Sequence, residues 1–158
     1  MIKRIWSLLT SCAVLISIDQ LSKWWALKNL LGRDIELTQN LTLSFAWNRG
    51  ISWSFFNEAS VIGFWLLTGF IALVTTIFAI YTVARFFNNY DSQCEIMVLA
   101  GALSNLIDRV LHGAVIDFID IHLGTWHWPT FNSADSFIVI GVCGILIKHF
   151  FYEDTRKI

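Results

Sequence analysis

The sequence predicts an all-α membrane protein with four transmembrane helices and a small β-structure on the outward-facing side of the membrane. Three observations support this fold class. Of the 158 residues, 56% are hydrophobic and only 15% are charged, well below the quarter that is usual for soluble domains. Residues 59–84 contain no charged side chain, which is long enough for a span of about 20 residues. Three other apolar segments approach this length.

The four spans are expected at about residues 5–27, 59–84, 95–111 and 131–151. The second is purely apolar or neutral, whereas the other three carry polar interruptions. Lys3 and Arg4 before the first span resemble the start of a cleaved signal peptide. No small-residue cleavage site follows this span, so we expect it to be retained. The whole chain then forms a single membrane domain.

Two segments between the spans are not expected to cross the membrane. Residues 34–56 include two stretches, 35–38 and 41–45, in which apolar and polar residues alternate. This period of two predicts short strands that lie on the outer membrane surface. Residues 113–130 are expected to form a second irregular loop.

The basic residues predict the orientation. With four spans, one side of the membrane carries Lys3, Arg4, Arg85, Lys148, Arg156 and Lys157. Cytoplasmic segments carry an excess of Lys and Arg. Both termini are therefore expected in the cytoplasm, and the two loop segments on the opposite side.

Polar residues from separate segments are predicted to meet near the outer membrane surface. At 1.5 Å per residue, Asp19 lies in the outer part of the first span, and Asn105, Asp108 and Arg109 lie near the outer end of the third. Charges inside spans are costly and tend to mark function. A purely structural alternative is that they pair locally, Asp19 with Lys23 and Asp108 with Arg109.

Asp117 and Asp135 are different, because neither has a basic residue nearby in the sequence. Two such carboxyl groups that face each other would share one proton, as in aspartic proteases. One would take a proton from water, and the other would donate to the scissile carbonyl. This chemistry needs no metal or cofactor. His122 and His127 are five residues apart and do not match the zinc-protease spacing H-E-x-x-H.

Five motifs together resemble one family, lipoprotein signal peptidase, also called signal peptidase II. They are DQLSK at 19–23, NRG at 48–50, GALSNLIDR at 101–109, GAVIDF at 113–118 and FNSAD at 131–135. They occur in the family's order and extend from the first span to the fourth.

The resemblance implies four transmembrane helices, a periplasmic β-cradle over about 34–56 and a short periplasmic helix or loop over 113–130. It implies that Asp117 and Asp135 are the catalytic pair. The residues expected to line or support this site are Asn48, Gly50, Asn105, Asp108, Arg109 and Asn132, with Asp19 and Lys23 as a neighbouring pair.

The implied substrate is a prolipoprotein whose cysteine carries diacylglycerol, cleaved just before that cysteine. The resemblance also implies a monomer in the bacterial inner membrane, in contact with lipids, with its active site near the periplasmic face. The net charge of −1 gives no indication of nucleic-acid binding.

The alternative function is a small proton or ion conductor, because intramembrane carboxylates also serve proton relays. A conductor should carry polar residues through the whole membrane depth. In this sequence the inner halves of the first three spans have few.

Overall fold

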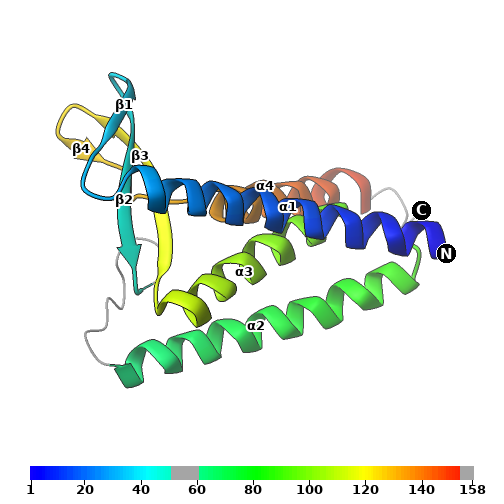
Figure 1. The fold of residues 1–158 in the computed structure, drawn as a ribbon. Coiled ribbons are helices and arrows are strands. Elements are labelled where there is room, and N and C mark those ends of the chain that lie inside the picture. Colours follow the sequence, from blue (N-terminus) through cyan, green and yellow to red (C-terminus); the bar gives the residue numbers. More distant parts are fainter. Residues whose placement is uncertain (51–60, 154–158) are drawn as a thin grey trace.

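The computed structural model describes residues 1–50 and 61–153. The long helices run side by side, and a sheet lies across one end of them (Figure 1). The helices are α1 (Ile2–Asn29), α2 (Val61–Phe87), α3 (Gln93–His112) and α4 (Ser133–Lys148), and a π-helical turn, His149–Glu153, follows α4. The N-terminus and the end of α4 lie at the end opposite the sheet (Figure 1).

Three helices among the described residues are long and apolar enough to cross a membrane, namely Ile2–Asn29, Val61–Phe87 and Ser133–Phe151. The expected spans at 5–27 and 131–151 fall on two of them. The span expected at 59–84 falls on α2, although residues 59 and 60 lie outside the described part. The helix α3, which covers the span expected at 95–111, is not among these three, so the fourth expected span is not confirmed.

The helix α3 packs against all three of the others, α1, α2 and α4. Its buried side chains include Glu95, Asn105, Asp108 and Arg109. A helix surrounded by other helices can carry polar groups because its neighbours, rather than lipid, supply their partners. It ends at Gly113, whose φ of 66° places it in the left-handed region that glycine tolerates.

The sheet has four antiparallel strands in the order β1-β2-β3-β4. They are β1 (Ile35–Thr38), β2 (Leu41–Asn48), β3 (Val115–Leu123) and β4 (Trp126–His127). The first two lie where the alternating pattern predicts strands, and β2 continues to Asn48. The rest of the expected β-cradle, residues 51–56, lies outside the described residues.

The prediction of a loop or short helix over residues 113–130 is wrong for most of that segment, which forms β3 and β4. The stretch from Val115 to Ile121 is rich in β-branched and aromatic residues, which favour strands. Its main partner is β2, and Ala46 pairs with Asp117. Because that partner lies about 70 residues earlier in the chain, no local hairpin signal identifies the strand.

A small apolar core joins the sheet to the bundle. Ala26 and Leu30 at the end of α1 pack against Ile116 and Phe118 of β3. This contact fixes β3 over one end of the helices and thereby positions Asp117.

Candidate active site

Asp117 and Asp135 lie where the sheet meets the helical bundle. Asp117 is on β3 and Asp135 is in the first turn of α4. The two carboxyl groups share one neighbour, Asn132, which caps the N-terminus of α4. The Asn132 side chain donates through Nδ2 to Asp117 Oδ1 at 2.7 Å, and its Oδ1 accepts from the Asp135 backbone N–H at 3.0 Å.

Asp117 is almost completely buried, with 2% of its surface exposed. Its second oxygen, Oδ2, accepts from Nδ2 of Asn48 at 2.8 Å. Burial raises the pKa of Asp117 to about 7, and the negative charge of Asp135 adds to this effect. The amide hydrogen bonds from Asn48 and Asn132, together with the charge of Lys23, act in the opposite direction. Asp117 is therefore poised to gain or lose a proton near neutral pH.

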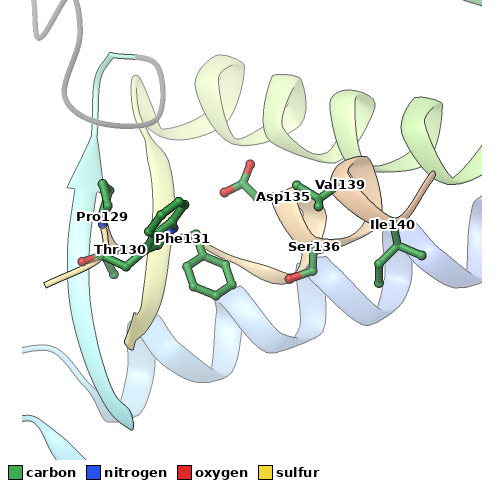
Figure 2. A pocket seen from close by; sticks show the side chains of 8 residues that line it. Pro129, Thr130, Phe131, Asp135, Ser136, Val139 and Ile140 are labelled. Atoms are coloured by element: carbon green, nitrogen blue, oxygen red, sulfur yellow. The ribbon is translucent and has the colours of Figure 1, made fainter. Parts of the chain in front are cut away.

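Asp135 is held by a capping box at the start of α4. Its Oδ2 accepts from the Asn132 backbone N–H at 3.2 Å, and its Oδ1 accepts from Asn105 Nδ2 at 2.8 Å. The reciprocal pattern of side chain and backbone is typical of a helix N-terminus. Figure 2 shows the Asp135 side chain at this first turn, with Ser136, Val139 and Ile140 along the same helix.

A buried ionic cluster lies beneath this pair. Lys23 is fully buried, and its Nζ lies 2.6 Å from Asp19 Oδ2, 2.9 Å from Asp108 Oδ2 and 2.8 Å from Asn105 Oδ1. The expected pairing of Asp19 with Lys23 is thus present. The alternative pairing of Asp108 with Arg109 is not seen among the ion pairs of the described residues. The Asp108 carboxylate instead contacts Lys23 and accepts from the Ile116 backbone N–H.

Arg109 and Gly50 lie together at the edge of the site. Arg109 is 5% exposed, and its Nη2 donates to the Gly50 carbonyl at 2.9 Å. Its Nη1 donates to the Asn105 carbonyl at 3.3 Å. The guanidinium therefore links the end of β2 to α3, and it lines the same hollow as Asp135.

Three hollows converge on the two carboxyl groups. The α4 hollow, about 440 Å³, includes Asp135 and is otherwise lined mainly by apolar and aromatic side chains (Figure 2). The interhelical hollow, about 290 Å³, also reaches Asp135 and lies between α2, α3 and α4. The sheet hollow, about 360 Å³, contains Asp117 and is lined by Ala46, Trp47, Asn48, Arg49, Asp117, Asp120, His127, Trp128, Pro129 and Thr130.

The sequence pattern of the family described as Signal peptidase (SPase) II matches residues 11–151. The chain belongs to the signal peptidase II family. The resemblance predicted from the five motifs is confirmed, and it makes the chain a peptidase that acts in lipoprotein processing.

Similar proteins agree with this assignment. A lipoprotein signal peptidase from Blochmanniella pennsylvanica is 36% identical, over 96% of this chain and 91% of that protein. Another, from Hydrogenovibrio crunogenus, is 34% identical over 91% of this chain and 85% of that protein. A solved structure described as a bacterial membrane enzyme has a TM-score of 0.77 at 27% identity, covering 98% of this chain and 93% of that one. Family membership and the apolar helices make the chain a bacterial membrane protein.

Beside the candidate site lie Gln20, Ser104 and Ser133, which sequence reasoning did not single out as site residues. Asp19 accepts hydrogen bonds from Ser104 Oγ, Ser133 Oγ and the Ala134 backbone N–H, each at 2.7 Å. Gln20 donates to Asp108 at 2.8 Å. Their signal is weak, because single Ser and Gln residues are tolerated in spans and gain meaning only through partners on other helices.

Among residues 1–50 and 61–153, no group of three His, Cys, Asp or Glu side chains is arranged to hold a metal ion. His122 and His127 stack on each other, with ring centroids 4.9 Å apart. His127 instead contacts Asp120, whose Oδ2 lies 2.9 Å from Nδ1.

Proposed function

We propose that this chain removes signal peptides from prolipoproteins, with Asp117 and Asp135 as an aspartyl dyad that activates water. The observation that carries the proposal is the shared contact with Asn132, whose Nδ2 donates to Asp117 Oδ1 and whose backbone N–H donates to Asp135 Oδ2. This residue thus holds two carboxyl groups, from β3 and α4, at one junction. Three hollows that open onto the pair leave room for a peptide and a water molecule.

The pKa of Asp117, raised to about 7, supports a division of roles. Asp117 carries the shared proton, and Asp135 is ionised. Asp135 takes a proton from water, and the resulting hydroxide attacks the scissile carbonyl carbon. Asp117 donates a hydrogen bond to the carbonyl oxygen, and a proton then passes to the departing amine as the C–N bond breaks.

The amide side chains hold this arrangement in place. Asn48 and Asn132 fix both oxygens of Asp117, while Asn105 and the Asn132 backbone fix those of Asp135. Lys23 Nζ donates to the side-chain oxygen Oδ1 of Asn105. This contact directs the side-chain N–H groups of Asn105 towards Asp135. Such preorganisation is the usual source of catalytic power.

The substrate is a prolipoprotein whose cysteine carries diacylglycerol, and the cleaved bond lies just before that cysteine. The apolar linings of the α4 and interhelical hollows suit the hydrophobic signal segment and the acyl chains. The enzyme works as a monomer among membrane lipids and needs no cofactor.

The sheet supports four membrane crossings. Strand β2 precedes α2, and β3 follows α3, yet the two strands pair. If α2 crosses the membrane, α3 must cross back to bring β3 to the same side. The chain thus has four spans in the bacterial inner membrane, with both termini in the cytoplasm and the sheet on the periplasmic face.

The test is a cleavage assay with a lipidated precursor and three Asp-to-Asn variants of the purified protein. Asp117→Asn and Asp135→Asn should each lower the cleavage rate by roughly 10²- to 10⁴-fold, the usual contribution of an acid–base group. The control is Asp91→Asn, which removes a carboxyl that pairs with Lys148 at the opposite end of the bundle. It should cleave at the wild-type rate.

Full activity in either dyad variant would refute the proposed mechanism. Loss of wild-type activity on addition of EDTA would favour a metal-dependent protease instead. A proton conductor, the second function considered, would give a proton flux in proteoliposomes that is lost in the same variants, without cleavage by the wild-type protein.

A further inference from the structure

Strand β3 contains a bulge next to Asp117. The backbone N–H groups of Phe118 and Ile119 both donate to the Phe131 carbonyl, at 3.0 and 2.8 Å. Two consecutive residues opposite a single partner form a β-bulge, which shifts the alternation of side chains along a strand. Asp117 and Asp120, three residues apart, consequently reach the same side, and both line the sheet hollow.

Asp120 is held in that hollow by a chain of side-chain contacts. Both of its oxygens accept from His127 Nδ1, at 3.0 and 2.9 Å. The His127 ring stacks on His122, and His122 Nε2 lies 3.1 Å from Thr42 Oγ1. The Asp120 side chain is 14% exposed and that of His127 is 55% exposed. The carboxylate is thus anchored in place while still facing the hollow.

The three hollows differ in chemical character. Those that reach Asp135 are lined mainly by apolar side chains of the helices and of residues 128–131, whereas the polar residues of the sheet hollow are Asn48, Arg49, Asp117, Asp120, His127 and Thr130. A prolipoprotein has the same asymmetry, because an apolar signal segment precedes the cleaved bond and a polar chain follows it. The sheet hollow therefore suits the polar chain after the modified cysteine.

The sheet hollow carries a basic residue, Arg49, and an acidic residue, Asp120, at different positions along the sheet. Arg49 directly follows the end of β2, next to Asn48 and hence to Asp117. Asp120 pairs across the sheet with Thr42, near the start of β2. In this register Asp117 lies between Arg49 and Asp120, because Asn48 is opposite Val115 and Thr42 is opposite Asp120. A chain that leaves the dyad along β3 towards Asp120 therefore moves away from Arg49 and meets the Asp120 carboxylate.

We propose that Asp120, held by His127, is a specificity residue that disfavours acidic side chains in the substrate segment just after the modified cysteine. This inference rests on the proposed function. Like charges placed opposite each other across an interface reduce affinity, and such repulsion is a common source of specificity. A neutral or basic side chain at the same place meets no such penalty.

The experiment uses three diacylglyceryl-modified precursors that carry Asp, Asn or Lys at the second residue after the cysteine. The kcat/KM of each is measured with the full-length protein. For the wild type we expect kcat/KM to be about five-fold higher for the Asn precursor than for the Asp precursor, the upper range for a pair of solvent-exposed charges. In Asp120→Asn the ratio of kcat/KM for the Asn precursor to that for the Asp precursor should fall to about one. In Asp120→Lys the Asp precursor should become the preferred one.

Glu36→Gln is the matched control, because it removes one exposed negative charge from β1, on the other side of β2. It should keep the wild-type ratio. A ratio that Asp120→Asn and Asp120→Lys leave unchanged, in protein that still cleaves, would overturn the proposal. A ratio that Glu36→Gln lowers as much would also overturn it, since the effect would then be one of net charge.

The same experiment distinguishes failure of the proposed peptidase function from failure of the specificity role of Asp120. If the wild type cleaves none of the three precursors, the proposed function itself is refuted. If it cleaves all three and the ratio does not depend on Asp120, only the specificity role is refuted.

Discussion

Asp117 is subject to two opposing influences. Burial and the nearby charge of Asp135 favour its protonated form, while two amide donors and the charge of Lys23 favour the ionised one. Burial is the largest of these influences, and the pKa rises to about 7. A dyad that works with one shared proton loses that proton when Asp117 ionises.

The pH dependence of cleavage follows from this ionisation. We expect kcat/KM for a lipidated precursor to fall as pH rises through an apparent pKa of about 7, because the form with one proton becomes depleted. The apparent value belongs to the coupled pair rather than to one residue. A rate that stays constant from pH 6 to 9 would contradict the assignment of the proton to Asp117.

Stability should depend on pH through the same group. In the unfolded chain Asp117 ionises near its ordinary value of 3.8, whereas in the folded protein it keeps its proton up to about pH 7. The folded state therefore binds more protons between these values, and its stability falls as pH rises through this window. The loss is complete above pH 7 and amounts to at most about 4 kcal/mol for a pKa raised from 3.8 to about 7.

Thermal unfolding in detergent tests this linkage. The Tm of Asp117→Asn minus that of the wild type should increase from pH 4 to pH 7 and then level off. The new amide faces the amide donors of Asn48 and Asn132, and this lowers the Tm of the variant by an amount that does not depend on pH. The change of the Tm difference with pH is therefore free of this cost. A difference that does not change with pH would mean that the carboxyl ionises normally in the fold.

The contact between α3 and α4 positions Asp135. A Cβ placed on Gly101 of α3 would collide with the Ala134 carbonyl and would lie 2.8 Å from Ile138 Cγ1. Ala134 precedes Asp135 in the first turn of α4, so even one methyl group at this place must displace the Asp135 side chain. The close approach of the two helices thus depends on the absence of a side chain at residue 101.

Gly101→Ala should lower stability by about 1–3 kcal/mol, the usual cost of overpacking, and cleavage by at least about 10-fold, because small misplacements of a catalytic group are costly. The matched control is Gly69→Ala on α2, where a Cβ meets nothing within 4 Å. It should leave both quantities near wild type or slightly raise stability, since Ala favours helix more than Gly. Cleavage rate and Tm of the two variants are compared directly.

The proposed four spans would bring the start of α1, the end of α4 and the α2–α3 connection to one side of the membrane. Arg4 donates to Asn89 Oδ1 and the Tyr90 carbonyl, and Lys148 Nζ lies 2.7 Å from Asp91 Oδ2. These contacts join the start of α1 and the end of α4 to the same turn, opposite the sheet (Figure 1).

Labelling with a membrane-impermeant maleimide tests the proposed orientation in right-side-out vesicles. With Cys12, Cys94 and Cys143 replaced by Ser, we expect Gln39→Cys in the β1–β2 turn to react in sealed vesicles. Asn88→Cys, after α2, should react only once the vesicles are opened. Equal reactivity of both positions in sealed vesicles would contradict the four-span topology.

The sequence by itself determined the membrane character, the positions of the apolar helices, the strands at 35–38 and 41–45, and the family. These features depend on local composition, period and motif order, all of which are readable along the chain. It also identified Asp117 and Asp135 as candidates, because each lacks a basic neighbour in sequence.

The tertiary structure decided which groups meet. It showed that 113–130 is mainly strand, that Asp108 faces Lys23 rather than Arg109, and that Asn132 connects the two carboxyl groups. It also placed Asp120 beside Asp117 through a bulge. These features depend on contacts between residues far apart in the chain, and such contacts leave no local pattern because their partners are chosen by packing.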